Sequence, residues 1–386
     1  MIPYGKQNIN QADIDAVIDV LKSDFITQGP AIDRFEKAVV NYTGAKYAVA
    51  VSNATAALHI ACLSLEVRSG DIAWTSPNTF VASANCILYC GGKVDFIDID
   101  EKTYNMSLEK LEEKLIQAEK SGKLPKVVIP VHFAGQSCDM KKIHDLSRKY
   151  GFKIIEDASH AIGGKYLNKP IGNCEYSDMA VFSFHPVKII TTGEGGMIVT
   201  NNEELYEKLI RLRSHGITRD RRFMTEDSHG PWYYQQIELG YNFRMTDIQA
   251  ALGASQMQRL DDFVKRRHEL ADRYDVLLKG FPLITPTQNP DTYSAFHLYV
   301  IRLRLDKILL SHRQVFEKLR ENGIGVQLHY IPVHIQPYYQ SLGFKKGDYP
   351  ASERYYAETI SLPMFFDLTF DQQDLVVEHL KNTLIG

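Results

Sequence analysis

Short apolar runs alternate with segments of helical periodicity from Ala12 to about Gly216. Several of these runs are continuously apolar, as expected for strands that are buried on both faces of a parallel sheet. The pattern therefore predicts an α/β fold in which helices cover a mainly parallel, seven-stranded sheet. The seven predicted strands are AVAVS, DIAWTS, KVDFIDID, KVVIPVHF, KIIED, MAVFSF and GGMIVTN. Helices are predicted from Asp33 to the glycine at 44 and from Ala54 onward.

The pattern changes after Met245, where helical periodicity continues for some thirty residues and could bridge two domains. A strand (HLYVIRL), a helix (SHRQVFEKLRENG), an extended piece (VQLHYIPVH) and two closing helices follow. We therefore expect a large α/β domain over residues 1–258 and a smaller α+β domain over residues 259–386.

Composition excludes several classes of protein. The formal net charge of −3, with both signs spread along the chain, argues against a nucleic-acid partner. No apolar run approaches the roughly 20 residues of a membrane span, and the N-terminus lacks the pattern of a secretory signal. The five cysteines form no CxxC pair, which disfavours a disulfide framework or a zinc site. A cytoplasmic location is expected.

Lys188 lies in SFHPVKIITTGEGG, between a predicted strand and a glycine-rich turn. Most single lysines in loops are solvated, but Val187, Ile189 and Ile190 surround this one with apolar side chains. A partly buried amine has a lowered pKa and can attack an aldehyde, as an imine-forming cofactor requires. On this segment alone, the catalytic and the surface interpretations are about equally favoured.

Asp157 and His160 follow the strand KIIED at its carboxyl end, the edge where ligands bind in open α/β sheets. A carboxylate there could hold the proton on the pyridine nitrogen of pyridoxal phosphate. The alternatives are a helix cap formed by Asp157, or a metal site shared with His160. No third ligand has suitable spacing, so a metal is disfavoured.

Two further strand ends carry candidate residues. In SNATAAL, the free backbone N–H groups near Ala54 and the hydroxyl of Thr55 could hold a phosphate, although simple helix capping would use the same residues. In SPNTFVASAN, the ring of Phe80 could stack on a pyridine ring, or it could be an ordinary core residue.

Together these segments resemble the DegT/DnrJ/EryC1/StrS family of sugar aminotransferases over nearly the whole chain. The SFHPVK–TTGEGG block and GYNFRMTDIQAALG are the most specific motifs; FITQGP, EDASHAIG, RSHG, HLYV and HYIPVH also match. The resemblance implies a fold-type I, aspartate aminotransferase-like enzyme with pyridoxal phosphate as cofactor. A histidine in place of Lys188 would mark the dehydratases of this family, and here the residue is lysine.

The resemblance also implies roles for individual residues. Lys188 would form the Schiff base with the cofactor and carry the proton in both half-reactions, and Asp157 would face the pyridine nitrogen. His160 would lie near the phenolic oxygen. The other cofactor contacts would be Ala54, Thr55, Phe80, Ser183 and, from the second subunit of a homodimer, Asn242.

Within the family, the segments around Tyr4, FITQG and VQLHYIPVH are similar to the pseudaminic acid pathway enzymes. This similarity implies amino transfer from L-glutamate to carbon 4 of a UDP-linked 4-keto-6-deoxy N-acetylhexosamine. The expected substrate contacts are Tyr4, Asp24, Phe25, Ile26, Thr27, Gln327, Leu328, His329 and Tyr330. For His329 and Tyr330, a strand with half-buried aromatic residues is an equal alternative. Three alternatives stay open: an aminotransferase that acts on another nucleotide sugar or at another carbon, a dehydratase that uses the same cofactor, and, more remotely, a non-catalytic regulator that binds it.

Overall fold

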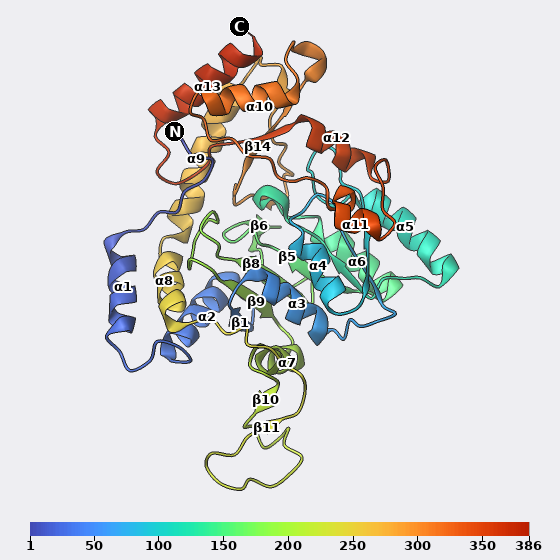
Figure 1. The fold of residues 1–386 in the computed structure, drawn as a ribbon, viewed down its shortest axis with the longest axis vertical. Coiled ribbons are helices and arrows are strands. Elements are labelled where there is room, and N and C mark those ends of the chain that lie inside the picture. The colour runs from blue at the N-terminus through green and yellow to red at the C-terminus, as the bar shows by residue number, and fades with distance from the viewer. Residues whose placement is uncertain (386) are drawn as a thin grey trace.

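The computed structural model describes residues 1–385 and is built around a seven-stranded sheet with the order β1-β9-β8-β5-β4-β2-β3 (Figure 1). Strand β9 is antiparallel to both of its neighbours, and the other pairings in the sheet are parallel. All seven predicted strands are present, and the predicted mainly parallel α/β fold is confirmed. Their bounds are β1 (Tyr47–Val51), β2 (Ile72–Thr75), β3 (Lys93–Phe96), β4 (Val127–Ile129), β5 (Lys153–Asp157), β8 (Met179–Ser183) and β9 (Gly196–Thr200).

Helices cover both faces of this sheet. Val127 and Ile129 of β4 pack in one apolar cluster with α3 (Ala54–Ser64), α4 (Ala82–Tyr89) and α7 (Glu203–Arg213). Val128 points the other way, into a cluster with α5 (Leu108–Ser121) and α6 (Met140–Tyr150). Side chains of successive strand residues alternate between faces, so strands of continuous apolar sequence supply both layers.

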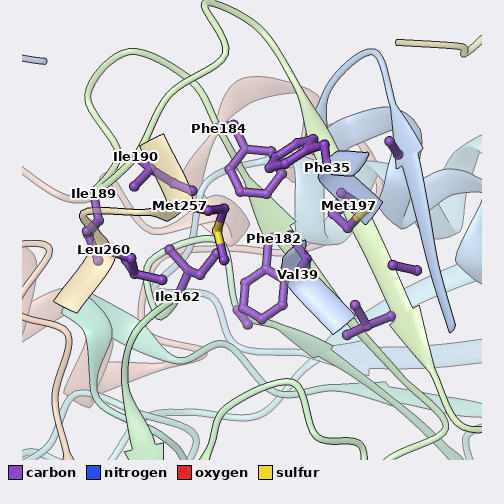
Figure 2. Packing of buried hydrophobic residues seen from close by; sticks show 14 of the residues in the cluster. Phe35, Val39, Ile162, Phe182, Phe184, Ile189, Ile190, Met197, Met257 and Leu260 are labelled. Atoms are coloured by element: carbon purple, nitrogen blue, oxygen red, sulfur yellow. The ribbon is translucent and has the colours of Figure 1, made fainter. Parts of the chain in front are cut away.

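A third cluster covers the end of the sheet near β8 and β9. Phe182 and Met197 of these strands pack against Phe35 of α2 (Pro30–Thr43) and Met257 of α8 (Asp247–Met257), as Figure 2 shows. Helix α2 begins three residues before the predicted Asp33, because Pro30 occupies its first turn. Gly44 ends it with a left-handed φ of 78°, as predicted from the glycine.

The long helical segment predicted after Met245 is two helices, α8 and α9 (Leu260–Leu277), with a break at Arg259. The Arg259 side chain contacts the N-terminal region: its Nη2 lies 2.5 Å from Asp13 Oδ2, and its Nη1 contacts the side chain of Asn8. Asp13 is fully buried, so this ion pair has little competition from water. The Arg259 side chain thus connects the junction between α8 and α9 to the N-terminal region.

The C-terminal part contains an antiparallel three-stranded sheet of β12 (Leu283–Ile284), β14 (Tyr299–Leu303) and β15 (Thr359–Leu362). It packs with α9, α10 (His312–Glu321) and α13 (Phe370–Leu384) around a separate apolar cluster. The predicted extended piece at 326–334 forms no strand; Gln327 makes a single bridge to Ser361 of the unforeseen β15. The predicted division between residues 258 and 259 falls between α8 and α9 and stays a prediction.

The remaining elements connect these layers or lie at the surface. The segment with β10 and β11 projects from the body below α7 (Figure 1). No helix within residues 1–385 is long and apolar enough to cross a membrane. The remaining helices are α1 (Gln11–Leu21), α11 (Pro337–Ser341) and α12 (Pro350–Glu358). The remaining strands are β6 (Lys165–Tyr166), β7 (Lys169–Pro170), β10 (Ile217–Thr218), β11 (Gln235–Gln236) and β13 (Thr292–Tyr293). The 3-10 turns are Phe133–Gly135, Leu305–Lys307 and Val333–Ile335.

Candidate active site

A cavity of about 620 Å³ lies at the carboxyl ends of the central parallel strands. Residues far apart in the chain meet in its wall, because parallel strands end at the same edge of a sheet. Most of the predicted site residues line this cavity, namely Tyr4, Ala54, Thr55, Phe80, Asp157, His160, Ser183, Lys188, His329 and Tyr330.

Lys188 lines the cavity from the loop that follows β8, where its backbone N–H donates to the carbonyl of His185. Burial lowers the pKa of its amine to about 8, although the negative charge of Asp157 acts in the opposite direction. Within the described residues the ammonium group has no salt-bridge partner. An appreciable fraction of the amine is therefore uncharged near neutral pH, as a nucleophile requires.

Asp157 is the last residue of β5, and only 5% of its surface is exposed. The backbone N–H of Ser159 donates to Oδ1 at 3.1 Å, and the hydroxyl of Ser83 donates to Oδ2 at 2.6 Å. Each carboxylate oxygen keeps a further lone pair. The carboxylate is thus held in one orientation and can still accept from a group in the cavity.

The N-terminus of α3 forms another part of the wall. The N-cap residue Asn53 accepts from Ala56 N through its side chain and from Ala57 N through its carbonyl. The N–H groups of Ala54 and Thr55 have no intramolecular acceptor in the described chain. Two free N–H groups at the positive end of an 11-residue helix form an anion site.

Gly196 allows this anion site to form. A Cβ atom at residue 196 would lie 2.6 Å from the carbonyl carbon of Asn53 and 2.7 Å from Ala54 N. Strand β9 can therefore approach the start of α3 closely only because residue 196 is glycine. The hydroxyls of Thr55 and Ser183 border the same part of the cavity and make no hydrogen bond to the protein within residues 1–385. These groups fit a phosphate.

A contact between His160 and Tyr330 connects the part of the chain that forms the large sheet with the C-terminal part. The N–H of Ala134 donates to His160 Nδ1 at 3.3 Å, and His160 Nε2 lies 3.0 Å from the Tyr330 hydroxyl. Burial, and then the charge of Lys188, holds the pKa of His160 well below its usual value. A neutral ring that accepts at Nδ1 carries its proton on Nε2, so His160 donates to Tyr330. The predicted contact of His160 with a cofactor oxygen stays a prediction.

Three further aromatic residues of the predicted set, Tyr4, His329 and Phe80, also line the cavity. The rings of Tyr4 and His329 are 5.5 Å apart, and His329 Nδ1 lies 2.8 Å from the hydroxyl of Ser361. Burial lowers the pKa of His329 to about 3, so this ring is neutral. Phe80 is 58% exposed, which is unusual for phenylalanine and leaves its ring free to contact a ligand.

The predicted substrate contacts from residue 24 to 27 and at residues 327 and 328 do not line this cavity. Thr27 pairs with Thr246, and Gln327 pairs with Ser361. Leu328 faces a surface groove beside α10 instead. Asp24, Phe25 and Ile26 also lie outside the cavity wall of the single chain.

Asn242 lies on the segment before α8, and it too is outside the cavity wall. It pairs with Ser214, while the next residues are bound to the end of β1: Ser52 N donates to Phe243 O at 2.8 Å, and Val51 pairs with Arg244. The rings of Tyr241 and Phe243 are stacked 4.9 Å apart and pack against His59 of α3. The role assigned to Asn242 requires a second subunit and stays a prediction, as do the substrate contacts assigned to residues 24–27.

Several cavity residues were not singled out from the sequence. Thr79, Ser159, His185 and Glu194 line the wall, and Ser83 binds Asp157 from behind it. Asn53 could have been recognised as the N-cap of the helix that begins at Ala54. Ser83 follows Phe80 by three residues, but its contact with Asp157 spans 74 positions and depends on the packing of α4.

Comparisons with known proteins identify the family of this chain. Residues 7–381 match the model of the DegT/DnrJ/EryC1/StrS aminotransferase family. The UDP-4-amino-4,6-dideoxy-N-acetyl-beta-L-altrosamine transaminase of Campylobacter jejuni is 37% identical over 386 residues, covering 100% of this chain and 98% of that protein.

Solved structures show the same fold at full length. PseC of Helicobacter pylori, an aminotransferase involved in the biosynthesis of pseudoaminic acid, superposes with a TM-score of 0.91 at 30% identity, with 99% of each chain covered. The putative sugar aminotransferase Spr1654 of Streptococcus pneumoniae, in its PLP form, gives a TM-score of 0.88 at 29% identity, with 99% of this chain and 98% of that chain covered. The predicted family, fold type and enzyme class are confirmed: the chain belongs to the DegT/DnrJ/EryC1/StrS aminotransferase family.

Proposed function

We propose that this chain uses pyridoxal phosphate to transfer the amino group of L-glutamate to carbon 4 of a UDP-linked 4-keto-6-deoxy N-acetylhexosamine. One observation carries the cofactor assignment: a lysine amine that forms no ion pair within residues 1–385, a buried carboxylate and an open helix N-terminus share a single cavity. The amine can react with an aldehyde, the carboxylate can pair with a protonated pyridine nitrogen, and the helix N-terminus can bind a phosphate.

The residues present would hold the cofactor as follows. The N–H groups of Ala54 and Thr55, with the hydroxyls of Thr55 and Ser183, would bind the phosphate. Asp157 would accept from the pyridine nitrogen, Phe80 would stack on the ring, and Lys188 would bind covalently. When bound, pyridoxal phosphate supplies an electron sink that stabilises negative charge on the carbon next to the amine.

The protein side chains would provide the acid–base chemistry. Lys188 would move the proton at the reacting carbon in both half-reactions, which a pKa of about 8 permits because both protonation states are populated near neutral pH. Since His160 donates to Tyr330, the proton of the Tyr330 hydroxyl is free for an acceptor in the cavity. We assign Tyr330 as a donor to an oxygen of the sugar.

The substrate assignment is supported by the named relatives. The Campylobacter jejuni relative is named for a UDP-linked 4-amino-4,6-dideoxy sugar, and the PseC structure belongs to the biosynthesis of pseudoaminic acid. Tyr4 and His329, which line the cavity, would contact the sugar. A UDP-linked substrate aminated at carbon 4 is therefore the assignment that these similarities favour.

Turnover of the UDP-linked 4-keto-6-deoxy N-acetylhexosamine with ¹⁵N-labelled L-glutamate tests this function. We expect a labelled 4-amino sugar and one equivalent of 2-oxoglutarate, measured by NMR and by an enzyme-coupled assay. The corresponding dTDP- and GDP-linked keto-sugars serve as controls for the nucleotide. A product that retains no label, or one formed without 2-oxoglutarate, would contradict amino transfer and favour the dehydratase reaction.

We also propose that the active unit is a homodimer with shared sites. The projecting segment around β10 and β11 exposes Trp232 and Leu239, at 71% and 78% of their surface. Large apolar side chains that are exposed on a projecting segment are available for contact with another protein surface. A second copy of the chain would cover them and would bring its Asn242 to the phosphate, since Asn242 does not reach the cavity of its own chain.

Mixed dimers test this sharing. The Asn242→Asp variant, which keeps the size of the side chain and repels phosphate, and the Lys188→Ala variant should each be nearly inactive as homodimers. When the two are unfolded and refolded together, a mixed dimer has one site with both defects and one with none. Random assortment should restore roughly a quarter of all sites.

Differential tagging would confirm that mixed dimers form. If mixed dimers are present and stay as inactive as their parents, Asn242 serves its own subunit or none, and the shared site is wrong. The assignment of Lys188 does not depend on that outcome.

A further inference from the structure

Two buried hydroxyls, those of Ser83 and Thr79, form a chain of hydrogen bonds that ends at Asp157. Ser83, on the first turn of α4, lies 2.6 Å from Asp157 Oδ2 through its Oγ. Thr79 Oγ1 lies 2.8 Å from the same Ser83 Oγ. Ser83 is fully buried and Thr79 is 2% exposed, so water does not offer these hydroxyls alternative partners.

The direction of this chain of hydrogen bonds follows from the donors available. An ionised carboxylate only accepts, and a serine hydroxyl has one proton. The other acceptor near Ser83 Oγ is the carbonyl of Phe80, at the much longer distance of 3.4 Å. Ser83 therefore donates to Asp157, and Thr79 donates to Ser83. Hydrogen bonds in such a series polarise and strengthen one another.

We propose that Ser83 is a positioning residue for Asp157, whose carboxylate it orients toward the ring nitrogen of the cofactor so that a proton stays on that nitrogen. This inference rests on the proposed function, in which Asp157 faces that nitrogen. The Ser83 bond stabilises the ionised carboxylate, since hydrogen bonds to charged groups are stronger than neutral ones. Without it, the carboxylate could turn away from the ring nitrogen, and the protonated ring would be less stabilised.

The Ser83→Ala variant, loaded with pyridoxal phosphate, tests the proposal. We expect it to bind the cofactor but to lower kcat about ten-fold, the value of one hydrogen bond to a charged group. The visible absorbance band of the bound cofactor should titrate at higher pH than in the parent, because a ring that is less fully protonated withdraws fewer electrons. The Ser83→Thr variant keeps the hydroxyl and should restore both kcat and the titration.

Ser64→Ala is the matched control. Ser64 is also buried, and its hydroxyl donates to the carbonyl of Ala61 on α3 rather than to Asp157. A general effect of losing a buried hydroxyl would appear in both alanine variants, whereas the titration should move only in Ser83→Ala. If Ser83→Ala does not fold, Ser83→Cys, with a weaker donor, replaces it, and its band should move in the same direction.

Parental kcat and an unmoved titration in the Ser83 variant would overturn the positioning role while the parent remains an active aminotransferase. An equal change in Ser64→Ala would overturn it as well. If the parent protein binds no pyridoxal phosphate at all, the proposed function fails, and the role of Ser83 fails with it.

Discussion

Replacing Lys188 by alanine is expected to lower turnover by about 1,000-fold or more, because one amine supplies both the covalent attachment and the proton transfer. Binding of pyridoxal phosphate should be weakened but retained, since the anion site at α3 and the Asp157 carboxylate are unchanged. Rates of 2-oxoglutarate formation and the absorbance of the dialysed protein measure these two effects. Lys141→Ala, at an exposed residue of α6, is the control and should behave as the parent.

The pH dependence of cofactor attachment provides an independent check on Lys188. Its pKa is lowered from 10.5 to about 8, so the amine is mostly protonated and unreactive below pH 8 and mostly neutral above it. The rate at which the cofactor-free protein forms its visible band should therefore rise through pH 8 and then level off. A rate that keeps rising toward pH 10 would show an ordinary solvated lysine, and full transamination by Lys188→Ala would remove the central assignment.

The second large effect is expected for Asp157→Asn, which should lower kcat by at least about 100-fold while the protein stays folded. An amide has nearly the size of the carboxylate, and its oxygen can accept from Ser159 N–H while its NH2 group donates to the Ser83 hydroxyl, but it does not hold a positive charge on the ring nitrogen. Circular dichroism and cofactor titration would show that fold and binding are kept. Asp145→Asn, the partner of Lys141 on the surface of α6, is the control. Parental turnover in Asp157→Asn would mean that Asp157 has only a structural role.

The central sheet could be predicted from sequence because each strand is an apolar run of its own, with a turn or a helix between one run and the next. Strand β15 could not, since it follows α12 directly at Thr359 without a glycine or proline to mark the change. Its formation depends on pairing with β14, more than fifty residues earlier. The break at Arg259 is likewise not marked by a glycine or proline, and there the Arg259 side chain contacts Asp13 and Asn8 from the other end of the chain.

The candidate site likewise contains some features that the sequence predicts and others that it does not. Lys188, Asp157 and the start of α3 are each marked by a strand end, so their meeting in one cavity follows from the topology of a parallel sheet. The hydrogen bond from Ser83 to Asp157 and that between His160 and Tyr330 depend on how α4 and the C-terminal part pack, which no local pattern encodes. Asn242, which is proposed to act across a dimer, does not line the cavity of its own chain.

The attachment of residues 243 and 244 to the end of β1 has a consequence for the proposed dimer. Ser52, which holds Phe243, immediately precedes the Asn53 cap, so the segment that presents Asn242 is anchored beside the anion site of its own chain. In a dimer with shared sites, the phosphate bound at α3 of one subunit would lie close in sequence and space to that subunit's Asn242 segment. The same segment would contact the phosphate bound by the second subunit. Occupancy of one site and order at the other would be coupled, and a half-loaded dimer would differ from the average of the empty and the full one.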